Sequence, residues 1–287
     1  GMSLAYAQSP PIVGSEQLSQ LMHRLRAQSG IKLDSTQAVI ARKIGERMTA
    51  LGMATSQEYM SLFDDSISAR AEWLALTDLL TIKQTRFFRQ PEAIDLVASY
   101  LENQFIGSVN APAEISFWSA GCSTGQELYS LAMVVDAYIR EHRPLVEWHG
   151  IGTDLSFQAI AEGQKACYSE LATAAIPAQY RREYVLAAAD AEFRISDDLL
   201  TRTHLFHSNL LHVHNAPFAD FDVIFCQNVL IYFDHPTRFW VINQLTERLR
   251  PGGLLVLGAG EDFRWSHPSM KRAPCPGVCA YKKLEVQ

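Results

Sequence analysis

The sequence predicts an α/β fold with a mostly parallel sheet in its second half, preceded by an all-α N-terminal domain. After about residue 115, short apolar runs alternate with helical patterns, which is typical of a sheet covered by helices on both faces. Before residue 80, apolar residues recur only at helical spacing. The chain has 287 residues and 48% apolar content, enough for a packed core in each half.

The N-terminal half begins with residues 1–14, which are rich in Ser, Gln and Pro and are expected to form a disordered lead-in. Residues 15–80 are predicted to form a helical domain. Its first helix carries apolar residues at helical spacing and ends near Gly30; they are Leu18, Leu21, Met22 and Leu25. Its second helix follows Asp34 and carries the apolar stripe Val39, Ile40, Ile44, Met48 and Leu51. Two shorter helices are expected near residues 56–63 and 68–80.

The second helix also carries a basic surface. Residues 21–50 contain six Lys or Arg and two acidic residues, although the whole chain has a net charge of −6. Lys43 and Arg47 lie four residues apart and share a face, with Arg42 beside it. This surface could steer an acidic partner, and an ordinary solvated helix surface is the alternative. The acidic net charge argues against a nucleic-acid-binding protein.

The second half is predicted to start with residues 81–114 as a linker and connecting helix. The α/β domain then spans residues 115–287. Strands are expected at 115–119, 148–153, 221–226 and 254–257, and helices at 127–140, 156–163 and 236–249. Residues 250–253 are expected to form a turn. Residues 165–204 are less periodic and indicate a small inserted subdomain. Residues 278–281 are predicted to form an antiparallel edge strand.

A loop of small residues, 121–125, follows the first predicted strand and precedes a helix. Loops at this place in doubly wound proteins bind nucleotide-like cofactors, because small residues let the ligand approach the backbone and the helix N-terminus. Gly121 and Gly125 fit neither G-x-G-x-x-G nor a P-loop, which argues against a nicotinamide enzyme or a kinase. An ordinary β–α turn is the alternative.

Four polar residues follow predicted strands or begin a helix. Asp154 ends the second strand, where a carboxylate can accept hydrogen bonds from ribose hydroxyls; capping the next helix is its alternative role. Glu127 starts the first helix, where it could recognise a ligand or only complement the helix dipole. Asn209 and Asn228 each follow an apolar run, so their amides could contact a ligand or form turns.

No metal site, membrane span or secretory leader is expected. The five cysteines are read as reduced thiols, and Cys275 and Cys279 lack a second pair that would complete a zinc site. His212 and His214 are read as solvated or capping residues. No apolar run approaches the roughly 18 residues of a membrane span. These features predict a cytoplasmic protein that does not insert into a membrane.

Three longer motifs occur in order along the chain. They are Thr85-x-Phe87-Phe88-Arg89, then Trp118-Ser119-Ala120-x-x-Ser123-Thr124-Gly125-x-Glu127-x-Tyr129-Ser130, then Phe221-Asp222-x-Ile224-Phe225-Cys226-x-Asn228-Val229-x-Ile231-Tyr232-Phe233. Together they resemble the chemotaxis receptor methyltransferase family, CheR. The resemblance runs from the helical domain to the C-terminal strand.

The resemblance implies a Rossmann-like enzyme that methylates glutamate side chains on chemoreceptor cytoplasmic helices. The cofactor is S-adenosylmethionine, and the products are glutamate methyl esters and S-adenosylhomocysteine. Cofactor contacts carried over from the family fall on Thr85, Arg89, Gly121, Glu127, Asp154, Asn209, Leu210, Gln227 and Asn228. The family associates Arg89 and Tyr232 with catalysis.

The resemblance also implies partners. The inserted subdomain corresponds to the family's small β-subdomain, which in some members docks on a receptor's C-terminal peptide. The basic residues Arg42, Lys43 and Arg47 then become candidates for binding the receptor's clustered glutamates, and the protein is expected to act as a monomer.

The chain departs from the family at the cofactor rim, where Lys83 replaces a common Asn and Gln227 replaces an Arg. Two alternatives stay open: a non-catalytic regulator that senses S-adenosylmethionine, and a methyltransferase acting on another substrate. Retention of Arg89 and Tyr232 argues against the regulator. RNA methylation would call for a larger positive surface, and small-molecule transfer would leave the helical domain unexplained.

Overall fold

The structure is a computed structural model that describes residues 11, 13–29, 37–80, 85–106, 111–230, 233 and 235–285, without the side chains of residues 25–29, 74, 77 and 78. The chain divides into two compact units, Gly1–Lys83 with Ile231–Asp234, and Gln84–Leu230 with His235–Gln287. Most of the expected lead-in lies outside the described residues, as do Gly30, Lys83 and Tyr232.

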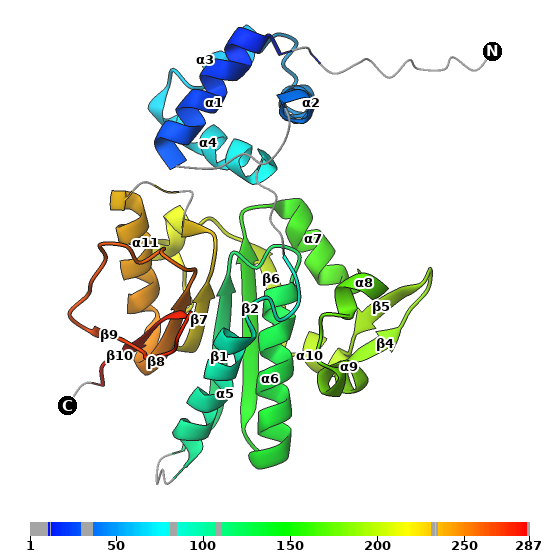
Figure 1. Cartoon of the computed structure of the whole chain (residues 1–287), viewed down its shortest axis with the longest axis vertical. Helices are drawn as coiled ribbons and strands as arrows, with labels where there is room; N and C mark the ends of the chain where they lie inside the picture. The colour runs from blue at the N-terminus through cyan, green and yellow to red at the C-terminus, as the bar shows by residue number, and fades with distance from the viewer. Residues whose placement is uncertain are drawn as a thin grey trace. The chain divides into compact units, whose positions relative to one another are not determined.

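The first unit contains four helices in its described part (Figure 1): α1 (Ser15–Ser29), α2 (Gln37–Ala50), α3 (Ser56–Ser61) and α4 (Ser66–Leu80). The apolar stripes of α1 and α2 meet Tyr59 and Trp73 in one core. Ile40, Ile44 and Met48 are fully buried there, as their spacing predicts. Leu51 was expected in the same stripe, but it lies beyond the end of α2 and is exposed.

The second unit is built on a seven-stranded sheet with the order β6-β2-β1-β7-β8-β10-β9. Five strands are parallel: β1 (Glu114–Ala120), β2 (Glu147–Asp154), β6 (Thr203–His207), β7 (Phe221–Cys226) and β8 (Leu249–Leu257). β10 (Cys279–Lys283) runs antiparallel to β8, and β9 (Met270–Arg272) runs antiparallel to β10. Because these five strands are parallel, their carboxyl ends lie at one edge of the sheet. After β6 the chain crosses back to β7 on the other side of β1, so the strand order reverses between β1 and β7.

Three details differ from the sequence expectation. The strand predicted at residues 278–281 is not the edge, because β9 pairs with its outer side. β6 and β9 were not predicted, since β6 is five residues long and β9 three, with no extended apolar alternation. The predicted turn at 250–253 lies inside β8, where the register with β7 shifts after Phe221 and Gly252 takes a φ of 83°.

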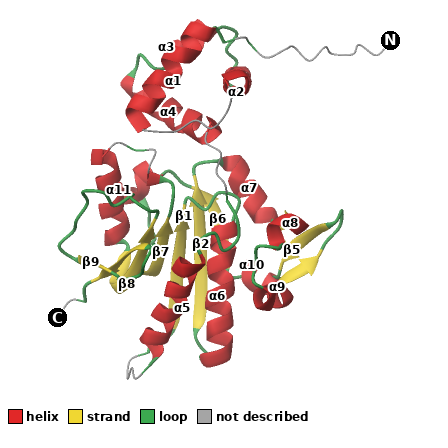
Figure 2. Cartoon of the chain, in the orientation of Figure 1, coloured by secondary structure: helices red, strands yellow, loops and turns green. Residues whose placement is uncertain are grey.

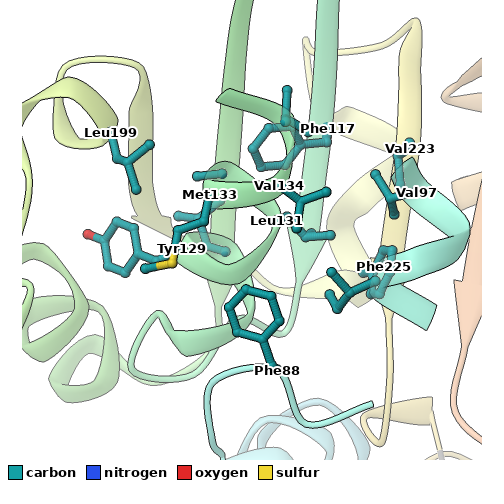
Figure 3. Packing of buried hydrophobic residues seen from close by; sticks show 14 of the residues in the cluster. Phe88, Val97, Phe117, Tyr129, Leu131, Met133, Val134, Leu199, Val223 and Phe225 are labelled. Atoms are coloured by element: carbon teal, nitrogen blue, oxygen red, sulfur yellow. The ribbon is translucent and has the colours of Figure 1, made fainter. Parts of the chain in front are cut away.

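Helices cover both faces of this sheet (Figure 2). α5 (Pro91–Phe105) and α6 (Gln126–His142) pack against each other and against Phe117, Val223 and Phe225, as Figure 3 shows for the centre of the cluster. Alternate strand residues point to the other face. There α11 (His235–Glu247) contacts β8 and the 3-10 helix η1 (Leu210–Asn215). The α/β fold is therefore confirmed.

A small antiparallel sheet is inserted after α7 (Phe157–Lys165). Its order is β3-β5-β4, formed by β3 (Cys167–Ser169), β4 (Val185–Ala187) and β5 (Glu192–Ile195). The short helices α8 (Glu170–Thr173), α9 (Ala178–Tyr184) and α10 (Asp197–Leu200) accompany it. Figure 1 shows these elements beside α6, which contacts both α9 and α10. None of the helices described is long and apolar enough to cross a bilayer.

Candidate active site

The loop between β1 and α6 is fixed by backbone hydrogen bonds to the end of β2. The amides of Gly121 and Cys122 both donate to the carbonyl of Thr153 at 2.8 Å. The amide of Ser123, which has a φ of 51°, donates to Oδ2 of Asp154 at 2.8 Å. A Cβ on Gly121 would lie 2.3 Å from Cγ2 of Val229, so only glycine fits this close approach. The loop is therefore rigidly placed at the carboxyl edge of the sheet.

A pocket opens beside this loop at the carboxyl ends of β1 and β7. It brings together six of the predicted cofactor residues, and they are Thr85, Arg89, Gly121, Glu127, Gln227 and Asn228. Phe88, Gln90 and Ser130 line it as well. The site thus combines one carboxylate, one guanidinium and three carboxamides beside the loop at residues 121–125.

Glu127 contributes the carboxylate of the pocket. Its Oε1 accepts a hydrogen bond from the Ser119 hydroxyl at 2.7 Å. The surrounding protein shields the group from water and raises its pKa to about 7, because burial disfavours the charged form. The Ser119 hydrogen bond and the charge of Arg89 counteract this rise, whereas the nearby Glu261 adds to it. An acid with this pKa can exist in either charge state near neutral pH.

The segment before α5 presents Arg89 to the pocket. Phe87 and Phe88 are buried, and the Phe87 ring meets Tyr168 edge-on at 4.8 Å. The Phe88 ring stacks on Tyr180 at 5.5 Å, and its amide donates to the Ser130 hydroxyl at 3.0 Å from a backbone φ of 51°. The two aromatic residues therefore anchor the segment, while the exposed Arg89 lines the pocket.

Asp154 lies outside the pocket lining and is only 2% exposed. Oδ2 of its carboxylate accepts from Ser123, and Oδ1 accepts from the amide of Ser156 at 3.0 Å. Its backbone carbonyl accepts from the amide of Ser208 at 3.0 Å. Asp154 thus connects three loops. The residue that caps α7 is Ser156, whose side chain accepts from the amide of Ala159.

Asn209 and Leu210 also lie outside the pocket lining. Oδ1 of Asn209 accepts from the amide of Leu211 at 2.9 Å, so Asn209 caps η1 in the way a turn-forming Asn does. Leu210 is buried. Cofactor contact by Asp154, Asn209 and Leu210 stays a prediction.

Gln227 and Asn228 follow β7. Nε2 of Gln227 donates to Oε1 of Gln90 at 2.6 Å. Asn228 has a φ of 60°, and its amide donates to the carboxylate of Glu261 at 2.7 Å. Sequence reasoning did not identify Glu261. The only sequence signal was an acidic residue directly after the small residues that end a buried strand, Gly258-Ala259-Gly260.

The basic surface predicted on α2 contains fewer unpaired cationic side chains than expected, because Arg47 pairs with Glu72. The Arg47 guanidinium forms two hydrogen bonds, of 3.0 and 2.8 Å, with the buried carboxylate of Glu72, which also accepts from the Tyr59 hydroxyl. This pairing raises the pKa of Arg47 and balances its charge within the helical unit. Nζ of Lys43 lies 3.4 Å from the carbonyl of Leu79, and Arg42 lies 3.9 Å from Glu46 in an exposed pair. The prediction that the three residues form one basic surface therefore stays a prediction for Arg42 and Lys43, whereas the charge of Arg47 is balanced by Glu72.

Metal ligands do not gather anywhere in the part of the chain that the structure describes, where no cluster of three or more His, Cys, Asp or Glu occurs. All five cysteines are free thiols.

The fold and this pocket define a Rossmann-like cofactor-binding protein with its site at the carboxyl edge of a parallel sheet. Residues 83–276 match the family described as CheR methyltransferase, SAM binding domain, over more than half of the chain. The chain belongs to this family, and the resemblance drawn from its three motifs is confirmed.

Curated relatives agree along most of the chain. A chemotaxis protein methyltransferase of Borreliella burgdorferi is 27% identical, covering 88% of this chain and 90% of the relative. One of Vibrio parahaemolyticus is 30% identical, covering 88% of this chain and 92% of the relative. A solved O-methyltransferase family protein from Burkholderia thailandensis is 15% identical with a TM-score of 0.39, covering 79% of this chain and 62% of that one.

The protein is accordingly an S-adenosylmethionine-dependent methyltransferase of the protein-glutamate type, and the predicted cofactor is confirmed. The residues present fit this cofactor. Its methionyl end carries an ammonium and a carboxylate, which the carboxylate of Glu127 and the guanidinium of Arg89 complement. Gly121 lines the pocket, and its lack of a side chain leaves room for Val229.

Proposed function

We propose that this pocket transfers the methyl group of S-adenosylmethionine to glutamate side chains on chemoreceptor cytoplasmic helices. The products are glutamate methyl esters and S-adenosylhomocysteine. The observation that carries the proposal is the convergence of Arg89, from the segment before α5, and Glu127, from the start of α6, onto one pocket beside the loop at residues 121–125. Membership in the family supplies the reaction class.

The reaction asks little acid–base work of the protein. A glutamate carboxylate with a pKa near 4.3 is already ionised at neutral pH, so no strong general base is required. When bound, the cofactor supplies a methyl group activated by its positive sulfur. The protein must hold the receptor carboxylate at roughly 3 Å from that methyl group, in line with the bond that breaks, and exclude water. Positioning therefore dominates catalysis.

Arg89 and Tyr232 are proposed to do this positioning. Arg89 lines the pocket, and its exposed guanidinium can hold the cofactor and draw in the receptor carboxylate. The Tyr232 hydroxyl is proposed to donate a hydrogen bond that orients the carboxylate. Tight ion pairing of the carboxylate would slow its attack, because its charge disappears in the ester. Orientation is therefore more useful here than strong binding.

Two further surfaces are proposed to contact the receptor in the cytoplasm. The cationic side chains of Arg42 and Lys43 on α2 complement receptor regions with clustered glutamates. The small sheet formed by β3, β4 and β5 corresponds to the subdomain that docks receptor C-terminal peptides in some family members. Both contacts are expectations from charge and from the family.

A labelling experiment tests the proposal. The protein is incubated with methyl-labelled cofactor and receptor-derived helices, and the label is then treated with base. We expect a label that base releases, and no label on matched helices whose glutamates are replaced by alanine. A base-stable label would indicate another substrate. Cofactor binding without transfer to any glutamate-bearing helix would indicate the regulator instead.

A further inference from the structure

The carboxylate of Glu261 lies at the carboxyl edge of the sheet, fully buried, outside the pocket lining. Its Oε1 accepts hydrogen bonds from the amides of Asn228 and Gly258, each at 2.7 Å. Its Oε2 accepts from the amide of Leu230 at 2.7 Å. One side chain thus satisfies three backbone groups, two after β7 and one after β8.

The turn after β7 depends on these bonds. Its amides leave the sheet ladder and would otherwise be buried without acceptors, which costs free energy comparable to a lost hydrogen bond for each group. Asn228 is also held at a φ of 60°, a conformation that needs support from its surroundings. A Cβ on Gly258 would lie 2.3 Å from Oε1 of Glu261, so the glycine leaves room for the carboxylate.

The same turn forms one wall of the cofactor pocket. Gln227 and Asn228 line the pocket directly. The next residue, Val229, packs against the loop after β1, because its Cγ2 is only 2.3 Å from where a Cβ on Gly121 would stand. A shift of the turn would therefore move two side chains of the pocket and loosen the packing of the loop after β1.

We infer that Glu261 is a positioning residue of the cofactor site. It acts through the backbone of residues 227–230 and keeps Gln227 and Asn228 at the pocket wall. The carboxylate form is required because it offers acceptors on both oxygens. A glutamine would place an NH2 group against a backbone N–H, and an aspartate would be one methylene too short to reach the turn. The inference rests on the cofactor pocket and not on the identity of the methylated substrate.

The test compares Glu261→Gln with Asp222→Asn. Asp222 is an equally buried carboxylate at the other end of β7, where it accepts from the amide of Ser116 at 2.9 Å and the hydroxyl of Tyr100 at 3.1 Å. Both variants are expected to unfold at lower temperature. Only Glu261→Gln is expected to raise the Kd for S-adenosylhomocysteine, by about tenfold, measured by calorimetric titration of the full chain.

A purely structural role predicts a different pattern. Irreversible unfolding lowers the fraction of protein that binds, and with it the titration stoichiometry and kcat, but leaves Kd unchanged. Reversible unfolding raises the apparent Kd only by the reciprocal of the folded fraction, which circular dichroism of the unliganded variant measures. We expect the KM for S-adenosylmethionine to rise with Kd, while kcat at saturating cofactor changes less. Equal Kd values for Glu261→Gln, Asp222→Asn and the unchanged protein would overturn the inference.

A second variant guards against failure of Glu261→Gln to fold. Gly258→Ala retains the carboxylate but crowds both it and Asn228, since a Cβ there would stand 2.3 Å from Oε1 of Glu261 and 2.9 Å from Oδ1 of Asn228. It is expected to raise Kd in the same direction, and an unchanged Kd in this variant would also overturn the inference. Because the titration uses only S-adenosylhomocysteine, its result is independent of whether receptors prove to be the substrate.

Discussion

The hydroxyl group of Tyr168 donates a hydrogen bond of 2.6 Å to the backbone carbonyl of Thr124. Tyr168 lies on β3 of the small sheet, and Thr124 lies in the loop at residues 121–125. Gly125 leaves space for this contact, because a Cβ there would stand 2.9 Å from the Tyr168 hydroxyl. The small sheet and the cofactor loop are therefore physically joined, and a change on one side is transmitted to the other.

Replacing Tyr168 by phenylalanine should weaken this joint. The carbonyl of Thr124 loses its partner, so we expect the free energy of unfolding to fall by about 1–2 kcal/mol and the Kd for S-adenosylhomocysteine to rise severalfold. Urea unfolding and calorimetry measure the two effects. Tyr180→Phe is a matched control, because no described residue forms a hydrogen bond with that hydroxyl. Equal changes in stability and in Kd for Tyr168→Phe and Tyr180→Phe would contradict a role of the Tyr168 hydrogen bond in cofactor binding.

Cofactor binding should depend on pH through Glu127. Its pKa of about 7 means that the unliganded carboxyl group is largely protonated below pH 7, whereas the cationic methionyl end of the cofactor favours the ionised form. We therefore expect Kd to fall as pH rises from about 5.5 to 7.5 and then to level off. Calorimetry in buffers of different ionisation enthalpy should detect proton release on binding below pH 7.

The substitution Glu127→Gln supplies the control for this pH dependence. It should weaken binding at pH 8 and flatten the profile. The unliganded protein should show a linked effect with a definite sign: since burial raises this pKa above its unfolded value, unfolding free energy should fall as pH rises from about 4.5 to 7. A wild-type Kd that is constant between pH 6 and 8 would contradict the proposed role of Glu127.

Replacing Asp154 by alanine should weaken cofactor binding by about 1.5–3 kcal/mol if its carboxylate also bonds the ribose hydroxyls. The variant should in addition lose stability, because the amides of Ser123 and Ser156 lose their acceptor. Titration with S-adenosylhomocysteine and urea unfolding separate the two losses. An unchanged Kd in the folded variant would leave Asp154 as a connection between loops.

Replacing Tyr232 by phenylalanine should leave product binding nearly intact and slow methyl transfer. Only a hydroxyl group is removed, so the effect belongs to the orientation of the receptor carboxylate and not to the binding of the cofactor. Single-turnover kinetics at saturating cofactor measures the chemical step. A wild-type rate constant would reduce Tyr232 to a packing role.

Substitutions of the basic residues of α2 should have two different effects, one on receptor methylation and one on stability. Lys43→Glu is expected to lower kcat/KM on receptor helices, most strongly at low salt, with cofactor affinity unchanged. Arg47→Glu should instead destabilise the helical unit, by about 3 kcal/mol, because it leaves the buried Glu72 without its partner. Arg70→Glu on α4 is the matched charge control. If Lys43→Glu keeps the wild-type kcat/KM at every salt concentration, Lys43 does not attract the receptor helices electrostatically.

The sequence was sufficient for the parts of the fold that depend on periodicity. Strands β1, β2 and β7 and helix α6 carry long apolar patterns, so their predicted bounds lie within two residues of the observed ones. The resemblance to the CheR family assigned Thr85, Arg89 and Glu127 to one cofactor site, and the structure brings them to one pocket, although Thr85 and Arg89 precede α5 and follow no strand. β9 did not follow, because a strand of three residues has almost no pattern of its own.

Contacts between segments that are distant in sequence could not be predicted, because local sequence patterns carry no information about them. Glu261 bonds residues about thirty positions away, and Arg47 pairs with Glu72 across two helices. Each partner has an ordinary local sequence, so the pairing exists only once the tertiary structure is formed. Asp154 shows the same limit within the site, because its position at the end of β2 was evident whereas its bonds to three loops were not.

The hydrogen bonds that Asp154 and Glu261 accept from loop amides affect which sequence changes the cofactor site can tolerate during evolution. Both carboxylates hold their loops by accepting hydrogen bonds from main-chain N–H groups, which every residue except proline possesses. At positions that do not require a glycine or a positive φ, mutations can therefore exchange the side chains of those loops without altering the path of the chain. Gln227 occupies one such position. A substitution there can change the affinity for the cofactor while the backbone that shapes the pocket stays the same.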